Sequence, residues 1–244
     1  MVTVMSDIKR AQAVWEKEYD TKQLMTGTKP IKSFTQWVKQ IIKSYDRRDE
    51  LYPLQGWKVL DLGSGEGKNA LYLAELGAQV YGIELARNAV ETTKQRAAAA
   101  DFEVGSVRVV QGSIGALYDF PDQHFDLIID VTSSNSLSEK ERQVYLEESF
   151  RTLKSDGHMF VRALCKDGDK NAKQLLQLHP GVERDTYSIP NWQQKERVFT
   201  ELDIRDLYST YFAIDRLIKE VHYTTYAGRK YKRNFWVLQL QKQA

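Results

Sequence analysis

The chain has 244 residues, of which 42% are hydrophobic and 28% charged, and its formal net charge of +2 says nothing about a partner. This composition is ordinary for a soluble globular protein, and the length allows one α/β domain with an elaborated edge or a domain with a lid. No apolar run is long enough to span a membrane, the first residues lack the core of a signal peptide, and the single Cys165 excludes an internal disulfide, so we expect a cytoplasmic protein.

Two amphipathic helices are predicted at the N-terminal end. Apolar residues at helical spacing predict one helix over residues 6–19 and a second over 33–46. Ser33 is a possible N-cap of the second helix.

The most informative segment runs from Val59 to Glu84. An apolar run enters a loop with glycine at positions 63, 65 and 67, a helical stretch follows, and a second apolar run ends at Glu84. Glycine permits sharp turns and a close approach of the backbone to a ligand. A carboxylate at the tip of the second strand can accept hydrogen bonds from both hydroxyls of a ribose. The segment therefore predicts that the chain binds an adenosine-containing cofactor.

The spacing of the glycines distinguishes between cofactors. A dinucleotide pattern, G-x-G-x-x-G, would require glycine where Lys68 stands, and Glu66 is an unfavourable neighbour for a pyrophosphate. Asp61, the G-x-G-x-G loop and Glu84 instead resemble motif I of the class I S-adenosylmethionine-dependent methyltransferases. This resemblance covers about residues 55–244. It implies S-adenosyl-L-methionine as cofactor and S-adenosyl-L-homocysteine as product.

Strand-like and helix-like segments alternate after the motif. Helices are predicted over 86–100 and 138–153, and strands over 107–111, 125–131 and 159–164. This alternation predicts a parallel sheet with helices on both faces.

The C-terminal part departs from the alternation. A helix with a capping box is predicted over 200–208, and two strand-like runs, 214–225 and 234–241, predict a hairpin that adds an antiparallel strand at the sheet edge. The resemblance implies a Rossmann-like, doubly wound α/β fold with seven strands in the order 3-2-1-4-5-7-6. By the same resemblance, residues 1–54 form an N-terminal helical lid and residues 55–244 the methyltransferase domain.

Cofactor-binding residues are expected where the carboxyl ends of the strands meet the point at which strand order reverses. The resemblance places there Asp61, Gly63, Ser64, Gly65, Gly67, Glu84, Leu85, Gly112, Ser113, Ile114 and Asp130. The family often has an acidic residue after the third strand, where this chain has Ser113. Adenine recognition is therefore expected from the Ser113 hydroxyl, backbone groups and the Ile114 side chain.

Two residues, Asp130 and Tyr19, are predicted to act in catalysis. Asp130 ends the 125–131 strand at the position that faces the transferable methyl group in the family, where it either accepts a proton from the substrate or only binds the cofactor's ammonium. Trp15 and Tyr19 resemble a Trp-x-x-x-Tyr pair by which the N-terminal segment of many small-molecule methyltransferases closes over the cofactor. Because aromatic residues at helical spacing are more often core residues, that alternative stays open.

The acceptor site is expected to combine short polar and aromatic side chains. The loop 132–135 does not match the Asn/Asp-Pro-Pro-Tyr/Phe signature, which counts against methylation of nucleobase or glutamine amino groups. The long insert 166–198 has turn-forming sequences rather than regular structure and is a possible substrate lid. Arg162 either binds a substrate carboxylate or pairs with a surface acid. The predicted substrate residues are Trp15, Ser133, Ser134, Asn135, Arg162, Tyr187 and Trp192.

These observations lead to one hypothesis and two alternatives. The four histidines lie far apart, so no metal site is predicted. We expect a methyltransferase that acts on a nitrogen, oxygen or sulfur atom of a small molecule. One alternative is an RNA or protein methyltransferase that uses the basic C-terminal hairpin. However, basic residues on an edge strand more often serve to prevent pairing with another chain. The other is a cofactor-binding module without transfer activity. No membrane partner is expected, nucleic acid is not favoured, and the oligomeric state stays open.

Overall fold

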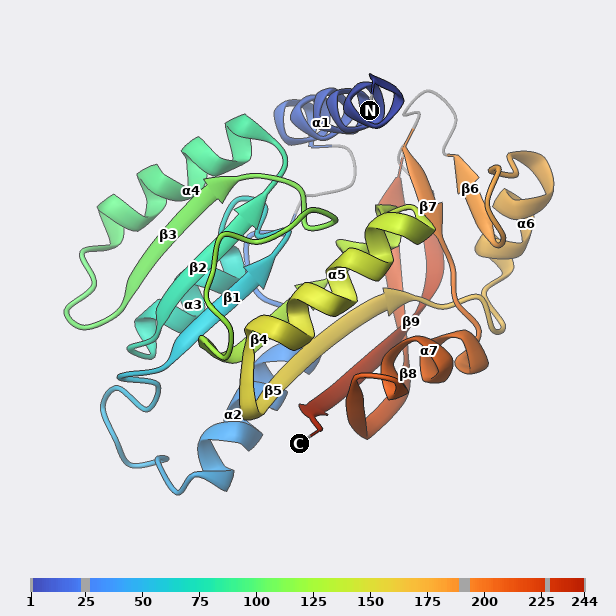
Figure 1. Cartoon of the computed structure of the whole chain (residues 1–244). Helices are drawn as coiled ribbons and strands as arrows, with labels where there is room; N and C mark the ends of the chain where they lie inside the picture. Colours follow the sequence, from blue (N-terminus) through green and yellow to red (C-terminus); the bar gives the residue numbers. More distant parts are fainter. Residues whose placement is uncertain (1, 23–26, 189–193, 227–228, 244) are drawn as a thin grey trace.

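A seven-stranded sheet with the order β3-β2-β1-β4-β5-β9-β8 forms the centre of the molecule (Figure 1). The computed structural model describes residues 2–22, 27–188, 194–226 and 229–243. The strands of this sheet are β1 (Lys58–Leu62), β2 (Gln79–Glu84), β3 (Ser106–Gln111), β4 (Phe125–Val131), β5 (Leu153–Leu164), β8 (Phe212–Tyr226) and β9 (Arg229–Lys242).

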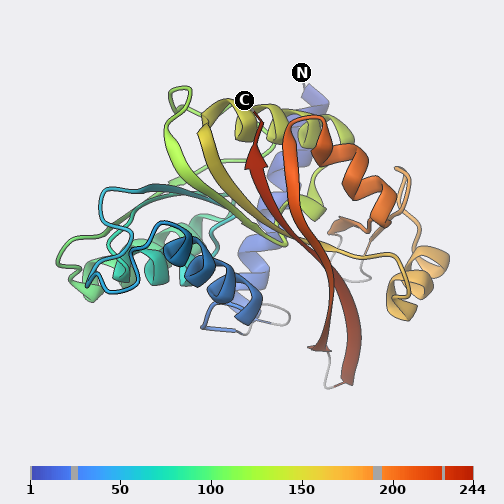
Figure 2. The same cartoon turned by 90° about the horizontal axis from the view of Figure 1, so that it is seen from below.

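The pairing of the strands confirms the predicted fold class and strand order. Neighbours among β1 to β5 pair in parallel, whereas β9 pairs antiparallel with both β5 and β8. The antiparallel strand is thus second from the edge, and β8 is the edge strand itself. Figure 2 shows the outer part of the β8–β9 hairpin extending away from the body of the molecule.

Helices cover both faces of the sheet. The helices and the two short strands outside the sheet are α1 (Val2–Thr21), α2 (Lys32–Ser44), α3 (Lys68–Glu75), α4 (Arg87–Ala100), the 3₁₀ turn η1 (Ser134–Ser136), α5 (Glu139–Thr152), α6 (Lys170–Leu178), β6 (Thr186–Ser188), β7 (Lys195–Arg197) and α7 (Glu201–Ser209). Successive side chains of a strand point to opposite faces. In β1, Val59 therefore packs in a core layer with residues of α2 and α3, while Leu60 packs in the other layer with residues of α5 and α7.

Most predicted boundaries hold to within a few residues, and two local predictions are wrong. Helix α2 begins at Lys32 with Ile31 at the N-cap, and the Ser33 hydroxyl has no hydrogen-bond partner among the described residues. The insert 166–198 contains regular structure, namely α6, β6 and β7. Its short elements gain their stability from contacts with the rest of the chain, a signal that local sequence patterns do not carry.

The two N-terminal helices have different surroundings. The apolar face of α2, which includes Phe34 and Trp37, is buried in the core layer with Phe160 of β5. Helix α1 instead lies beside α4 at the carboxyl end of the sheet (Figure 1). A lid role for residues 1–54 stays a prediction. Because α2 is packed into the core, of the two helices only α1 is placed to act as a lid. No helix in the described part of the chain is long and apolar enough to cross a membrane.

Candidate active site

A cavity of about 650 Å³ lies beyond the carboxyl ends of β1, β2, β4 and β5. The glycine loop after β1 forms one wall, and α1 contributes Trp15 and Tyr19. At the other end of the cavity, β7 contributes Glu196 and the β8–β9 hairpin contributes Tyr223 and Phe235. Segments that lie far apart in the sequence thus surround one continuous space.

The glycine loop adopts a backbone that favours glycine at three positions. The φ angle is 71° at Gly63, 55° at Gly65 and 79° at Gly67. A Cβ atom on Gly65 would lie 2.7 Å from the Tyr19 hydroxyl oxygen, so α1 leaves no room for a side chain there. The Thr93 hydroxyl of α4 donates to the Gly65 carbonyl at 2.9 Å and holds the loop in place.

Glu84 ends β2 directly beside this loop. Its two carboxylate oxygens accept hydrogen bonds from the backbone N–H of Gly65 at 2.9 Å and of Ala86 at 2.8 Å. The side chain lines the cavity and is 5% exposed, and burial raises the pKa of its carboxyl group. Glu84 therefore lies where the sequence predicted an acceptor for the ribose hydroxyls. Each of its oxygens also accepts one backbone hydrogen bond, which fixes the orientation of the carboxyl group.

Asp61 lies behind the glycine loop rather than on the cavity surface. Burial, followed by the charges of Glu84 and Asp130, raises the pKa of its carboxyl group from the ordinary value of 3.8 to about 8, and Lys68 opposes the shift. Its Oδ2 atom has no hydrogen-bond partner among the described residues. A buried carboxyl without a donor is an expensive arrangement, and a cationic group of a ligand would relieve it.

The cofactor-binding residues predicted after β2 and β3, among them Ser113 and Ile114 for adenine, lie on the β2–β3 side of the cavity. Leu85, Gly112, Ser113 and Ile114 all line it. The Ser113 hydroxyl accepts a hydrogen bond from the Gly115 N–H at 3.1 Å, which leaves its own proton free to donate.

Asp130 does not face the cavity, contrary to the predicted position opposite the transferable methyl group. The side chain is fully buried and does not line the cavity. Its Oδ1 accepts from the Ser133 N–H at 2.8 Å, and its Oδ2 accepts from the Tyr145 hydroxyl at 3.0 Å. The Ser134 N–H lies 3.4 Å from both oxygens. The carboxyl group therefore orders the loop after β4, and the geometry gives it no direct access to a substrate.

Two of the three substrate residues predicted in that loop reach the cavity. Ser133 and Asn135 line it, whereas Ser134 is buried beneath it. The Asn135 Oδ1 accepts from the Leu164 N–H at 2.9 Å, which fixes the orientation of the amide. The Nδ2 group then has no partner among the described residues and is available to donate to a ligand.

Both predicted residues of α1 line the cavity. The rings of Trp15 and Tyr19 lie 6.3 Å apart, and Tyr19 packs against Ala86 and Ala89. Burial, followed by the charge of Glu84, raises the pKa of the Tyr19 hydroxyl well above its ordinary value. The hydroxyl therefore stays protonated at neutral pH and can act as a hydrogen-bond donor but not as a base.

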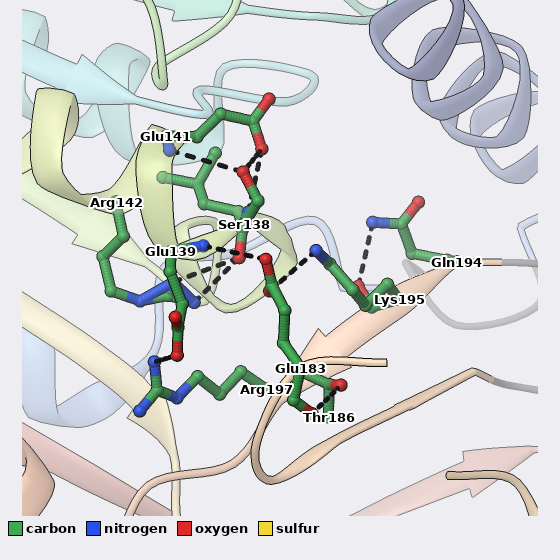
Figure 3. A network of polar contacts seen from close by, with 10 residues as sticks. Ser138, Glu139, Glu141, Arg142, Glu183, Thr186, Gln194, Lys195 and Arg197 are labelled. Atoms are coloured by element: carbon green, nitrogen blue, oxygen red, sulfur yellow. Dashed lines mark hydrogen bonds and ion pairs between the residues drawn. The ribbon is translucent and has the colours of Figure 1, made fainter. Parts of the chain in front are cut away.

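The insert contributes to the site differently from the prediction. Tyr187 is fully buried behind the cavity wall and does not line it, and Trp192 lies outside the described residues. Figure 3 shows how the insert is held against the start of α5. Glu183 accepts from the Glu139 N–H at 3.2 Å and pairs with Lys195 at 3.0 Å, while Arg197 pairs with Glu139 at 3.5 Å.

Arg162 lines the cavity, and an internal acid already pairs with its charge. Its Nε lies 2.8 Å from an oxygen of Glu220, and its guanidinium lies 3.4 Å from the centre of the Phe235 ring. The sequence left two alternatives for Arg162, binding of a substrate carboxylate or pairing with a surface acid. The contacts show pairing with an acid, but the arginine is buried rather than at the surface.

Several cavity residues were not predicted from the sequence. They include Lys68, Asn69, Ser136, Glu196 and Arg233. Lys68 and Asn69 directly follow the glycine loop, so their position next to the motif could have indicated them. Glu196 reaches the cavity through the pairing of β7 with β6, and Arg233 through the pairing of β9 with β5 and β8. No local sequence pattern predicts these pairings.

Buried polar atoms without partners gather at this cavity. Among the described residues that line it, the unpartnered atoms are Ser64 Oγ, Asn69 Oδ1, Asn135 Nδ2 and Ser136 Oγ. Buried polar groups are normally satisfied, so the concentration here indicates a polar ligand. Together with the close-packed glycine loop and the acids Asp61 and Glu84, these atoms fit a nucleoside with a cationic tail. No group of three or more potential metal ligands occurs in the described residues.

Comparisons with known proteins agree with this geometry. A family model described as "Methyltransferase domain" matches residues 60–161. An uncharacterized methyltransferase of Schizosaccharomyces pombe is 30% identical over 108 residues, which are 44% of this chain and 72% of that protein. A ubiquinone biosynthesis O-methyltransferase of Pelagibacter ubique is 27% identical over 147 residues, 57% of each chain. The crystal structure of a SAM-dependent methyltransferase from Methanosarcina mazei superposes with a TM-score of 0.66 and 23% identity, covering 78% of this chain and 94% of that one.

Proposed function

This chain belongs to the class I S-adenosylmethionine-dependent methyltransferases, and we propose that it moves the methyl group of S-adenosyl-L-methionine to a nitrogen, oxygen or sulfur atom of a small molecule. The buried Cys165 suits a reducing compartment, and we place the reaction in the cytoplasm.

One observation carries the small-molecule proposal: the cavity continues from the glycine loop into a second half that is walled on several sides. Beyond the loop after β4, its lining comes from β5, β7, β8 and β9, including Leu164, Glu196 and Phe235. A site that buries most of a ligand's surface among apolar walls and a few polar groups is typical for small molecules.

The residues of the first half fit the cofactor. Glu84 would accept hydrogen bonds from the ribose hydroxyls, and the backbone at Gly63 and Gly65 would pass along the methionine portion. Asn69 offers an unpartnered oxygen at the cavity that suits an ammonium group, and the Asp61 carboxyl group behind the loop would favour the same positive charge. When bound, the cofactor supplies an activated methyl carbon on a good leaving group.

The chain's own part in the reaction is positioning. The acceptor atom must lie in line with the methyl carbon and sulfur, at about 3–3.5 Å from the carbon. Asn135, whose amide is fixed by Leu164, and Ser133 line the space beyond the glycine loop and would orient the acceptor. The carboxyl groups of Asp61 and Asp130 lie behind the loop, and a cationic sulfonium would favour their ionised form.

The cofactor assignment is tested by calorimetric titration with S-adenosylmethionine and S-adenosylhomocysteine. We expect binding by the wild type, no binding by Gly65→Val because its side chain would collide with Tyr19, and at least ~10-fold weaker binding by Glu84→Ala because two ribose hydrogen bonds are lost. Glu91→Ala, an exposed acid of α4, serves as the matched control. Retained affinity in both site variants would contradict the assignment.

The acceptor class is tested by incubating the enzyme and labelled cofactor with separate small-molecule, RNA and protein fractions of a cell extract. We expect label in the small-molecule fraction. Label in RNA that falls steeply with salt would favour the nucleic-acid alternative. In that case Lys230 and Lys232, which are exposed on the hairpin, would be the contacts to test, since Arg233 is paired with Asp169 inside the molecule. Cofactor binding without transfer to any fraction would favour a non-catalytic module.

A further inference from the structure

The far end of the cavity holds a network of charged and polar side chains that the methyl-transfer machinery does not explain. Glu196 and Arg233 line this end, and Tyr187 joins them from behind the wall. The Tyr187 hydroxyl donates to the Glu196 Oε2 at 3.0 Å and accepts from the Arg233 Nη2 at 2.8 Å. Tyr187 is fully buried, so the link is rigid.

A second carboxylate takes the charge of Arg233. Asp169 has a side chain that is 0% exposed, and its Oδ2 lies 3.3 Å from the Arg233 Nε. Asp169 also accepts from the backbone N–H groups of Ala172 and Asn234, each at 2.8 Å. Asp169 is therefore the fixed counter-ion of Arg233, while Glu196 reaches the guanidinium only through the Tyr187 hydroxyl.

The network thus holds two carboxyl groups for one guanidinium, and the surplus acid is the one on the cavity wall. No donor in the described part of the chain reaches the Glu196 Oε1. Burial raises the pKa of the Glu196 carboxyl, although the Arg233 charge and the Tyr187 hydrogen bond oppose the shift. A positively charged group in the cavity would supply the missing compensation.

Two neighbouring cations are already paired. Arg162 is paired with Glu220 at 2.8 Å, and Lys195 with Glu183 at 3.0 Å. Lys68, the first residue after the glycine loop, also lines the cavity, and the charges of Asp61 and Arg162 act on its ammonium. The lining from β5, β8 and β9 includes Leu164, Tyr223 and Phe235, which are apolar or aromatic, and also His222. This surrounding favours an amine with an apolar body over an anion.

We propose that Glu196, oriented by Tyr187 and Arg233, is the recognition residue for an amine-bearing acceptor, whose ammonium or N–H group binds the free carboxylate oxygen. This inference rests on the proposed methyltransferase function and names the class of acceptor for the same cavity.

The test uses the full chain saturated with S-adenosylhomocysteine and two matched probe sets, benzylamine with benzyl alcohol and benzoate, and butylamine with butanol and butyrate. Binding is measured by ligand-observed NMR titration. We expect the amine of at least one set to bind at least ~10-fold more tightly than its alcohol and carboxylate counterparts, because only the amine forms a charge-assisted hydrogen bond with the carboxylate.

Two variants test whether Glu196 is the source of the preference for amines. Glu196→Gln is nearly isosteric and should remove the preference while leaving the affinity for S-adenosylhomocysteine unchanged. Glu147→Gln, an exposed acid on α5, is the matched control and should keep the preference. Equal binding of the three chemical classes, tighter binding of the carboxylates, no binding of either amine, or a preference that survives in Glu196→Gln would each overturn the proposal. Failure of the cofactor to bind would instead count against the methyltransferase function, because the probes can also be titrated without it.

Discussion

Lys68 presents a charge to the cavity that the described residues do not neutralise by a hydrogen bond or an ion pair. It lines the cavity as the first residue of α3, beside Asn69, whose Oδ1 is also unpartnered. Burial lowers the pKa of its ammonium, and the charge of Asp61 opposes that shift. A cation near two unpartnered oxygens, Asn69 Oδ1 and Asp61 Oδ2, matches the two ends of an amino acid. We therefore expect Lys68 to bind the carboxylate of the cofactor's methionine portion.

The prediction is that Lys68→Met weakens binding of S-adenosylhomocysteine by ~10-fold or more, the loss of one charge-assisted hydrogen bond. Binding of methylthioadenosine, which has the same nucleoside and thioether but no amino acid, should not change. Lys68→Arg is the control that keeps the charge. Calorimetry measures all three, and an equal loss for both ligands would show that Lys68 only supports the loop.

Residue roles were predictable where they follow from the backbone. Gly63, Gly65 and Gly67 have the positive φ angles that the loop requires, and Glu84 ends β2 as the alternation implied. Asp130 ends β4 as predicted, but three hydrogen-bond donors, two of them in the following loop, turn its carboxyl group away from the cavity. Which way a side chain turns depends on such donors, and their approach is a property of the folded loop.

At the scale of elements, each of the two N-terminal helices has a tryptophan, and the two tryptophans differ in how deeply they are buried. Trp37 of α2 is 2% exposed and packs on Phe160 of β5, with 5.3 Å between ring centres, whereas Trp15 of α1 is only partly buried at the cavity. We expect Trp37→Ala to lower the free energy of unfolding by about 3–5 kcal/mol. Trp15→Ala should lower it by about 1 kcal/mol or less but weaken the binding of S-adenosylhomocysteine.

Urea unfolding followed by circular dichroism, together with calorimetry, separates these effects. If Trp37→Ala were to weaken ligand binding without loss of stability, α2 would belong to a lid rather than to the core. The sequence could not distinguish the two helices, because an apolar stripe shows that a face is covered and not what covers it. The sheet was predictable because its strands carry their own apolar pattern, whereas β6 and β7 have three residues each and depend on ion pairs such as that of Arg197 with Glu139.

At the scale of the whole molecule, the site is built at the expense of stability. Asp61, Glu84 and Asp130 bring three carboxyl groups to the ends of adjacent strands, and burial raises the pKa of each. A carboxyl group whose pKa is higher in the folded than in the unfolded state binds more protons when folded. It therefore makes folding less favourable as the pH rises from the unfolded pKa to the folded one.

For Asp61 this interval extends from its ordinary pKa of 3.8 to about 8. Asp61→Asn removes the titration, so the free energy of unfolding of the variant, relative to the wild type, should increase between pH 4 and pH 8 and stay constant above. The slope is at most about 1.4 kcal/mol per pH unit. Urea unfolding at a series of pH values measures this difference, in which the contributions of Glu84 and Asp130 largely cancel. A saturating concentration of S-adenosylhomocysteine should flatten the dependence, because its ammonium stabilises the ionised carboxylate. A stability difference that does not change with pH would mean that Asp61 is ionised in the free protein and that the loop already compensates its charge.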